Sequence, residues 1–159
     1  MQRVGFGYDS HRFAEGRALV LGGVRIEHDR GLEGHSDADA ALHAVTDAVL
    51  GALALGDIGS LFADTDPRWK GADSAVFVRE AVRRAGEKGF AVANCDVTVL
   101  AEAPRLAPHR DAMRRSIAAA LGVAPNAVSV KAKTNEGMGW IGRGEGVAAL
   151  AVVMMETPE

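Results

Sequence analysis

The chain has 159 residues, a length that suits one domain, 1–159, with its own hydrophobic core. Its 18 basic and 21 acidic residues give a formal net charge of −3, which argues against nucleic acid or an anionic membrane as a partner. The single cysteine, Cys95, excludes an internal disulfide and a multi-cysteine zinc site. The N-terminus does not resemble a signal peptide, and the longest apolar run is too short to span a bilayer.

The first half of the chain predicts a strand, a hairpin and a long helix. Residues 2–8 have the pattern of a short strand, and residues 18–28 form two β-rich runs about Gly22-Gly23, which is typical of a hairpin. Apolar residues recur at i, i+3 and i+4 over 37–54, which predicts a helix with Ser36 as its N-cap.

The second half predicts a long loop followed by alternating helices and strands. The expected elements are a loop over 56–73, a helix over 74–88, a strand over 90–101, a helix over 108–121, a strand over 127–134, a glycine-rich loop over 137–146 and a strand over 147–156. This order predicts an α/β (α+β sandwich) fold with one mixed β-sheet and helices packed on one face. The nearly all-apolar last strand indicates burial on both faces, by helices or by another subunit.

Three side chains could form a metal site. Asp9 and His11 lie two residues apart at the end of the first strand and therefore point to the same side, and His43 lies in the second turn of the long helix. Three such ligands with one open position are typical of a catalytic zinc site. Asp39 and Asp47, at i−4 and i+4 from His43, could orient its free ring N–H. The alternative is a chance D-x-H pair and a half-buried histidine bonded to an acidic neighbour.

Two segments could bind phosphate. His35 and Ser36 precede the long helix, where free backbone N–H groups attract anions. In the stretch 131–146, Thr134 offers a hydroxyl, Glu136 could hold Mg²⁺, and glycines let backbone amides approach an anion. The cations of this stretch are Lys131, Lys133 and Arg143. The alternative is a solvated turn between two strands.

Two further loops could contact the rest of a substrate. The acids of 56–67 suit hydrogen bonds to sugar or polyol hydroxyls, or a metal, or they cap a turn. The connector 100–108 leads irregularly from a strand to a helix, and its exposed backbone could read a base edge. From its residues alone it is a loop. Cys95, within a strand, is expected to be a small core residue.

Taken together, these segments resemble one enzyme family over Arg3 to about Met155. The resemblance rests on GYDSHRF (7–13), GHSDADAALHAVTDAVLGALALGDIGSLFADTDPRWKGADS (34–74), DVTVLAEAPRL (96–106) and KAKTNEGMGWIGRGEG (131–146). The family is that of the 2-C-methyl-D-erythritol 2,4-cyclodiphosphate synthases, which serve isoprenoid biosynthesis by the non-mevalonate pathway.

The resemblance implies a bacterial cytoplasmic lyase. Its substrate would be 4-diphosphocytidyl-2-C-methyl-D-erythritol 2-phosphate, whose 2-phosphate attacks the β-phosphate to give the cyclic diphosphate and CMP. It also implies a homotrimer with sites at the subunit interfaces and a central apolar cavity able to hold an isoprenoid diphosphate. Zn²⁺ would be held by Asp9, His11 and His43, and Mg²⁺ or Mn²⁺ by Glu136 with the substrate diphosphate.

The resemblance also assigns residue roles. His35 and Thr134 match the catalytic positions that place phosphate and stabilise the transition state. The matched substrate-binding positions are Asp9, His11, His35, Ser36, Asp57, Gly59, Phe62, Asp64, Asp66, Ala101, Ala103, Arg105, Leu106, Ala107, Lys133, Thr134, Asn135, Glu136, Trp140 and Arg143. Lys133 and Asn135 depart from threonines of the family pattern, Arg105 from lysine and Trp140 from phenylalanine.

Two other functions stay open. A metal-dependent phosphohydrolase of a nucleotide-linked substrate could use the same ligands to activate water. A non-enzymatic oligomeric module could bind metal or an isoprenoid diphosphate, although a purely structural metal does not need the phosphate-binding stretch 131–146.

Overall fold

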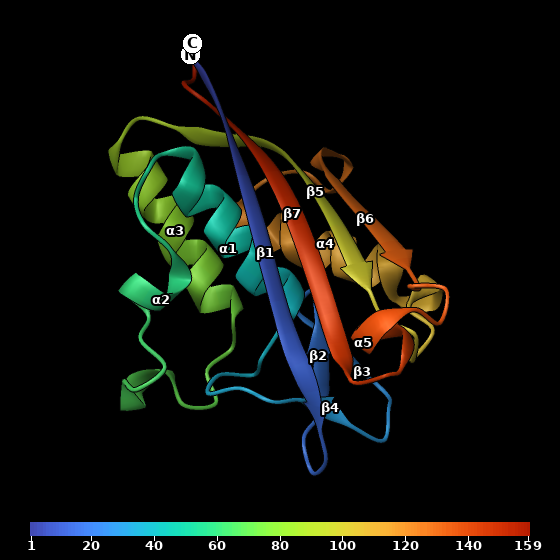
Figure 1. The fold of residues 1–159 in the computed structure, drawn as a ribbon. Coiled ribbons are helices and arrows are strands. Elements are labelled where there is room, and N and C mark those ends of the chain that lie inside the picture. The colour runs from blue at the N-terminus through green and yellow to red at the C-terminus, as the bar shows by residue number, and fades with distance from the viewer.

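The computed structural model describes residues 1–159 and contains one mixed five-stranded sheet. In spatial order the strands are β4 (Gly31–Leu32), β1 (Gln2–Ala14), β7 (Gly146–Glu156), β5 (Ala91–Leu100) and β6 (Val128–Lys133) (Figure 1). Only the β5–β6 pair is parallel. The predicted hairpin is confirmed as β2 (Leu19–Leu21) and β3 (Val24–Ile26), which pair in a separate small sheet.

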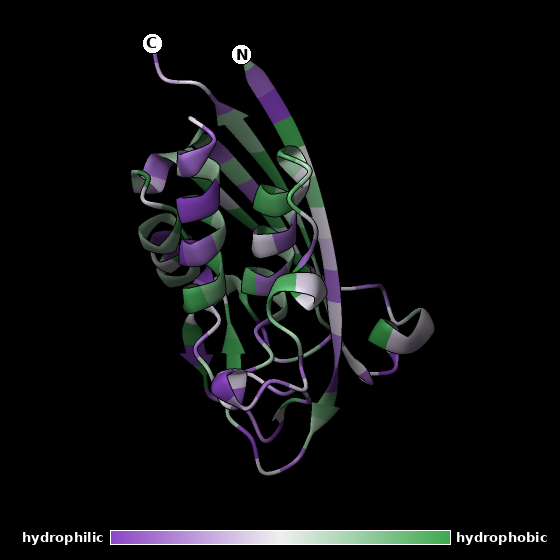
Figure 2. Ribbon diagram, turned by 90° about the vertical axis from the view of Figure 1, so that its left-hand side faces the viewer, coloured by the Kyte–Doolittle hydropathy of each residue, from purple (hydrophilic) through white to green (hydrophobic).

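Three long helices lie on one side of the sheet (Figure 2), as the element order predicted. They are α1 (Ala40–Ala52), α3 (Ala75–Glu87) and α4 (Arg110–Leu121). The shorter helical elements are α2 (Ile58–Leu61), η1 (Pro67–Trp69), η2 (Ala107–His109), η3 (Pro125–Ala127) and α5 (Gly139–Gly142). None of the helices combines the length and the apolar character that crossing a bilayer requires.

Helix α1 lies directly on strand β1 because two glycines leave room for it. A Cβ atom on Gly5 would lie 1.7 Å from the carbonyl oxygen of Ala48, and one on Gly7 would lie 1.9 Å from that of Ala44. Both glycines belong to the set of alternate β1 residues whose side faces the helices. The close contact places the next two members of this set, Asp9 and His11, against α1.

The other face of the sheet is not covered by helices. An apolar stripe on that face is formed by the cross-strand pairs Val4–Met154, Phe6–Val152 and Tyr8–Leu150. Val4, Phe6 and Tyr8 are 61%, 60% and 50% exposed, whereas Val153 on the opposite face of β7 is fully buried. Of the two expected sources of burial for the last strand, helices cover only one face, so burial of the other face by a second subunit stays a prediction.

Several predicted boundaries are wrong. Strand β1 extends to Ala14 because it pairs with β7 as far as Arg12 and then with β4, so Asp9 and His11 lie inside the strand and not at its end. Helix α1 begins at Ala40, with Asp39 as its N-cap in place of Ser36. Ala38 has a φ of 58°, which is incompatible with a helix that starts earlier.

Both long loops contain short helices that the sequence reading did not predict. Asp57 forms a capping box with Ser60 at the start of α2, and Asp66 caps the 3₁₀ turn η1. Helix α5 lies inside the glycine-rich loop that was expected over 137–146. Four-residue helices have too little periodicity to be recognised from hydrophobic pattern.

Candidate active site

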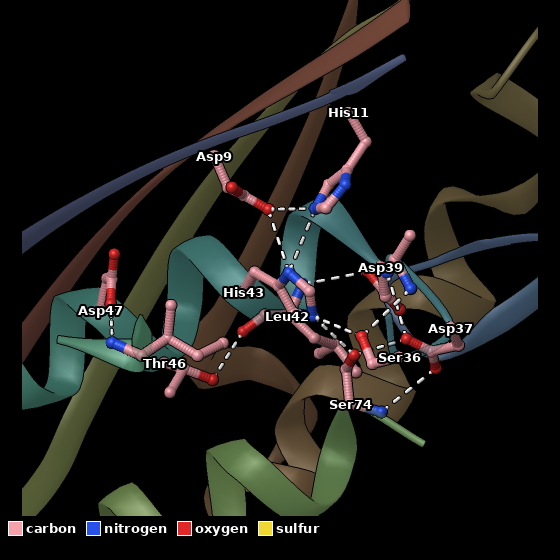
Figure 3. Close-up of polar contacts among 12 residues, drawn as sticks. Asp9, His11, Ser36, Asp37, Asp39, Leu42, His43, Thr46, Asp47 and Ser74 are labelled. Atoms are coloured by element: carbon pink, nitrogen blue, oxygen red, sulfur yellow. Dashed lines mark hydrogen bonds and ion pairs between the residues drawn. The ribbon is translucent and has the colours of Figure 1, made fainter. Parts of the chain in front are cut away.

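Asp9, His11 and His43 converge on one point between β1 and α1 (Figure 3). Asp9 Oδ2 lies 2.7 Å from His11 Nε2 and 3.1 Å from His43 Nδ1, and the two histidine nitrogens are 3.2 Å apart. We call these three residues the metal-ligand cluster. The predicted convergence of residues from distant parts of the chain is confirmed.

The ring orientation of His11 is fixed by the backbone. His11 Nδ1 donates a hydrogen bond of 2.7 Å to the Glu33 carbonyl oxygen, which can only accept. In the neutral ring Nε2 then keeps the lone pair that would bind a metal; without a metal, Nε2 lies 2.7 Å from Asp9 Oδ2, and a protonated ring donates a hydrogen bond to that carboxylate. Burial acts to raise the pKa of Asp9, but hydrogen bonds from His11 and His43 outweigh it and lower the pKa to about 2. The Asp9 carboxylate is therefore ionised at neutral pH.

The expected role of Asp39 and Asp47 beside His43 is wrong. The Asp39 carboxylate accepts backbone N–H groups from Gly22, Gly23 and Leu42, and so joins the β2–β3 turn to the start of α1. Asp47 accepts the N–H of Ile58 at 2.7 Å. Burial raises the pKa of Asp39 to about 6 against the lowering effect of its N–H donors. Neither carboxylate bonds the imidazole. Residues on the same face of a helix need not direct their short side chains toward one another.

His35 and Ser36 lie next to the cluster in a segment held by other groups. His35 Nε2 donates to the Asp66 carbonyl oxygen at 2.8 Å, and the Ser36 hydroxyl accepts the N–H of Ala38 at 3.2 Å and lies 3.1 Å from His43 Nε2. Helix α1 begins after Asp39 and not after Ser36. Ser36 is therefore not followed directly by the free helical N–H groups that were expected to bind a phosphate.

A cavity of about 360 Å³ opens beside the metal-ligand cluster. Its lining comprises His11, Gly34, His35, Ser36, His43, Ile58, Gly59, Phe62, Ala63, Asp64, Trp69 and Phe77. Gly59, Phe62 and Asp64 were predicted to contact substrate, and the structure places them here. Asp57 and Asp66 do not line the cavity, because their carboxylates cap α2 and pair with Arg68.

The remaining predicted residues lie elsewhere on the chain. Six of them line a second cavity at the ends of β5 and β6: Ala101, Arg105, Leu106 and Ala107 of the connector, and Lys133 and Thr134 at the end of β6. Ala103, Glu136, Trp140 and Arg143 are exposed and lie outside this lining, as does the half-buried Asn135. Arg143 pairs with Glu145 at 2.8 Å. We call residues 101–107 and 133–143 together the connector-loop region.

The register of the sheet separates the metal-ligand cluster from the connector-loop region. Ser10, which lies between Asp9 and His11, pairs with Ala148; Ala148 pairs with Leu100, and Leu100 with Lys133. Three inter-strand steps of about 4.8 Å put Ser10 and Lys133 roughly 14 Å apart. Within one chain the predicted residues therefore form two groups and not one site.

Comparison with known proteins gives the family. A model of the YgbB family matches residues 2–156. The chain belongs to this family. A 2-C-methyl-D-erythritol 2,4-cyclodiphosphate synthase from Laribacter hongkongensis is 61% identical over 155 residues, which cover 98% of this chain and 96% of that protein.

Solved structures agree with this membership. A 2C-methyl-D-erythritol-2,4-cyclodiphosphate synthase in its CDP-bound form matches with a TM-score of 0.89 and 43% identity, over 97% of this chain and all of that one. The bifunctional IspDF from Campylobacter jejuni matches with a TM-score of 0.95 and 42% identity. This chain spans only 43% of that bifunctional protein, although it is fully covered itself.

Three residues of this YgbB-family chain were missed by the sequence reading. Arg17 donates two 2.6 Å hydrogen bonds to the carbonyl oxygens of Gly34 and Ser36, and thereby holds the backbone on both sides of His35. Glu102 Oε1 accepts the N–H groups of Asn135 and Gly137, at 2.8 and 3.2 Å. Both contacts join residues that are distant in sequence, so no local pattern could reveal them.

Trp69 is the third missed residue. Its ring packs edge-on against Phe62, with centroids 5.4 Å apart, and Phe62 in turn packs 4.6 Å from Phe77. The three rings form an apolar wall of the cavity. Composition could have indicated this wall, because aromatic residues are only 5% of the chain and three of them lie between residues 62 and 77.

Proposed function

We propose that this protein converts 4-diphosphocytidyl-2-C-methyl-D-erythritol 2-phosphate into 2-C-methyl-D-erythritol 2,4-cyclodiphosphate and CMP. An oxygen of the 2-phosphate forms a bond to the β-phosphorus, and the bond from that phosphorus to the CMP oxygen breaks. The observation that carries the proposal is the convergence of Asp9, His11 and His43 at the wall of a cavity. The named synthase relatives and the CDP-bound structure support it.

The metal-ligand cluster fits a zinc ion. Tetrahedral ligands about 2.05 Å from Zn²⁺ lie about 3.3 Å from one another. The three donor atoms are 2.7 to 3.2 Å apart, so shifts of a few tenths of an ångström suffice. One carboxylate and two imidazoles are also a common zinc donor set. When bound, Zn²⁺ would neutralise charge on the phosphoryl oxygens.

The chain itself needs to supply positioning more than covalent chemistry. Nucleophile and electrophile belong to one substrate molecule, and holding them in line can contribute about 7–11 kcal/mol. In this proposal His35, whose imidazole is held by the Asp66 carbonyl, places a phosphate, and the Thr134 hydroxyl stabilises charge in the transition state. The wall of Phe62, Trp69 and Phe77 excludes water from the methylerythritol portion.

A second copy of the chain would complete each site, and a third copy would close the ring. We propose a homotrimer in which the connector-loop region of one subunit, including Glu136 with Mg²⁺ or Mn²⁺, faces the metal-ligand cluster of its neighbour. Two observations support this: the two groups lie roughly 14 Å apart along one sheet, and the apolar stripe is exposed in the single chain. The stripe would then line a central cavity able to hold an isoprenoid diphosphate. A cytoplasmic location belongs to the same proposal.

Phosphorus NMR tests this function directly. Purified protein with substrate, Zn²⁺ and Mg²⁺ is expected to give the cyclic diphosphate and CMP. His43→Ala should lose bound zinc and CMP release together. An open monophosphate carrying oxygen from water would instead show a phosphohydrolase, and full turnover by His43→Ala would refute the assigned metal site.

A further inference from the structure

We propose that Ser74 and Asp37 are positioning residues that determine which ring nitrogen of His43 carries hydrogen, and so direct its other nitrogen at the metal. The inference rests on the zinc site proposed above and adds to it two residues from outside the metal-ligand cluster. It is carried by a hydrogen-bonded chain that runs from a carboxylate through a hydroxyl to the imidazole (Figure 3).

The chain of contacts is continuous, and it is buried at His43 and Ser74 and half-buried at Asp37. His43 Nε2 lies 2.8 Å from Ser74 Oγ, and the Ser74 hydroxyl bonds Asp37 Oδ1. Asp37 is held in turn by two backbone donors, since its Oδ2 accepts the N–H of Ser74 at 3.1 Å and its Oδ1 that of Asp39 at 3.1 Å. Ser74 is fully buried. The Ser74 hydroxyl therefore lies between two fixed hydrogen-bond partners, Asp37 and His43.

The direction of each hydrogen bond follows from the donors and acceptors present. A carboxylate only accepts, so the Ser74 O–H donates to Asp37 and its oxygen offers a lone pair to His43 Nε2. His43 must then donate from Nε2. A neutral imidazole has one N–H, so Nδ1 keeps its lone pair, and Nδ1 is the atom that faces Asp9 and His11.

The Ser74 hydroxyl has no competing local role. Ser74 occupies the N-cap position of α3, where a serine side chain ordinarily bonds the helix backbone, yet it makes no capping hydrogen bond. Asp73 accepts the N–H of Ala75 instead. The Ser36 hydroxyl also lies 3.1 Å from His43 Nε2, but its bond to Ala38 does not determine which way its own hydrogen points. Ser74 is therefore the group that fixes the direction.

The test compares zinc affinity in Ser74→Ala and wild type, by competition with a chromophoric zinc chelator. Loss of a group that orients a ligating histidine typically weakens metal binding by about 10–100-fold, and that loss is expected here. Thr46→Val is the matched control: its hydroxyl is equally buried and lies on α1, but it donates to the Leu42 carbonyl and not to His43. Zinc affinity of the control should match wild type.

Two measurements separate positioning from folding. Metal-free Ser74→Ala should still unfold in one cooperative transition, although it loses the hydroxyl's hydrogen bonds, because α3 loses no cap and Asp37 keeps its two backbone donors. In zinc-loaded wild type, ¹⁵N NMR of the His43 ring should show hydrogen on Nε2 in slow exchange with water, and Ser74→Ala should exchange it faster. Hydrogen on Nδ1 in the wild type would overturn the proposal whatever the variant does.

Failures of the two proposals are distinguishable. If wild type binds no zinc, or His43→Ala binds as well as wild type, the metal site itself is wrong. If wild type binds zinc, His43→Ala does not, and Ser74→Ala binds as tightly as wild type, only the positioning role of Ser74 and Asp37 is refuted.

Discussion

The metal-ligand cluster and the connector-loop region are built in different ways. The cluster joins a strand to a helix that lies against it, and its three donor atoms already face one another within a single chain. The connector-loop region lies at the ends of β5 and β6, where Glu136 and Trp140 are exposed. One half of the proposed site is therefore completed by packing within the chain, whereas the other half would be completed only in the homotrimer proposed above.

The two regions are also held by different kinds of contact. Groups from several elements fix the cluster: the backbone carbonyl of Glu33 holds His11, and the side chain of Ser74 holds His43. In the connector-loop region, one carboxylate, Glu102, accepts two backbone N–H groups of the loop. We therefore expect substitutions in one region to leave ligand binding in the other unchanged.

The largest expected effect comes from breaking the contact that forms the cluster. Gly7→Ala places a Cβ 1.9 Å from the Ala44 carbonyl oxygen, so β1 and α1 must separate. We expect a loss of about 3 kcal/mol in the free energy of unfolding, measured by denaturant titration, together with weaker zinc binding.

Gly86→Ala is the matched control for that substitution. Gly86 lies in α3 with open space around the added methyl group. Alanine is favoured there by about 0.5–1 kcal/mol, so this variant should be slightly more stable than wild type. Equal stability of Gly7→Ala and wild type would show that α1 does not depend on glycine to approach β1.

A smaller effect is expected in the connector-loop region. Glu102→Ala leaves the N–H groups of Asn135 and Gly137 without their acceptor, whereas Glu102→Gln keeps a carbonyl oxygen that can accept both. Loss of this partly exposed contact should cost about 1 kcal/mol of CMP binding free energy, so CMP should bind about fivefold more weakly to Glu102→Ala. Calorimetry should show near wild-type CMP affinity for Glu102→Gln and unchanged zinc affinity for both.

The smallest effect is expected when native protein is treated with a thiol reagent, whose target is Cys95. This residue lies on β5 under the helices. The thiol is buried, and burial together with the nearby Asp96 carboxylate raises its pKa to about 12. It therefore stays protonated at pH 8, and the native protein should not react with a thiol reagent until denaturant is added. Rapid labelling of native protein would show that the covered face of the sheet opens.

The sequence by itself determined the main strands and helices, the fold class and the three residues that could hold a metal ion. The strand pattern of residues 2–8, the helical periodicity over 37–54 and the Gly22-Gly23 turn are local signals, and local backbone preference is enough to produce them, although the structure moves the boundaries of both elements. Asp9, His11 and His43 followed from the chemistry of metal ligands together with the family resemblance, and the structure brings them together.

Tertiary structure decided which groups surround those ligands. The sequence suggested Ser36 as the N-cap of the helix and Asp39 as the partner of His43. In the folded chain Asp39 is the N-cap, and the His43 imidazole instead contacts Ser74, 31 residues away. Sheet register likewise placed Lys133 and Thr134 far from His11. A short polar side chain has several partners within reach, and only the long-range packing of strands and helices determines which of them it meets.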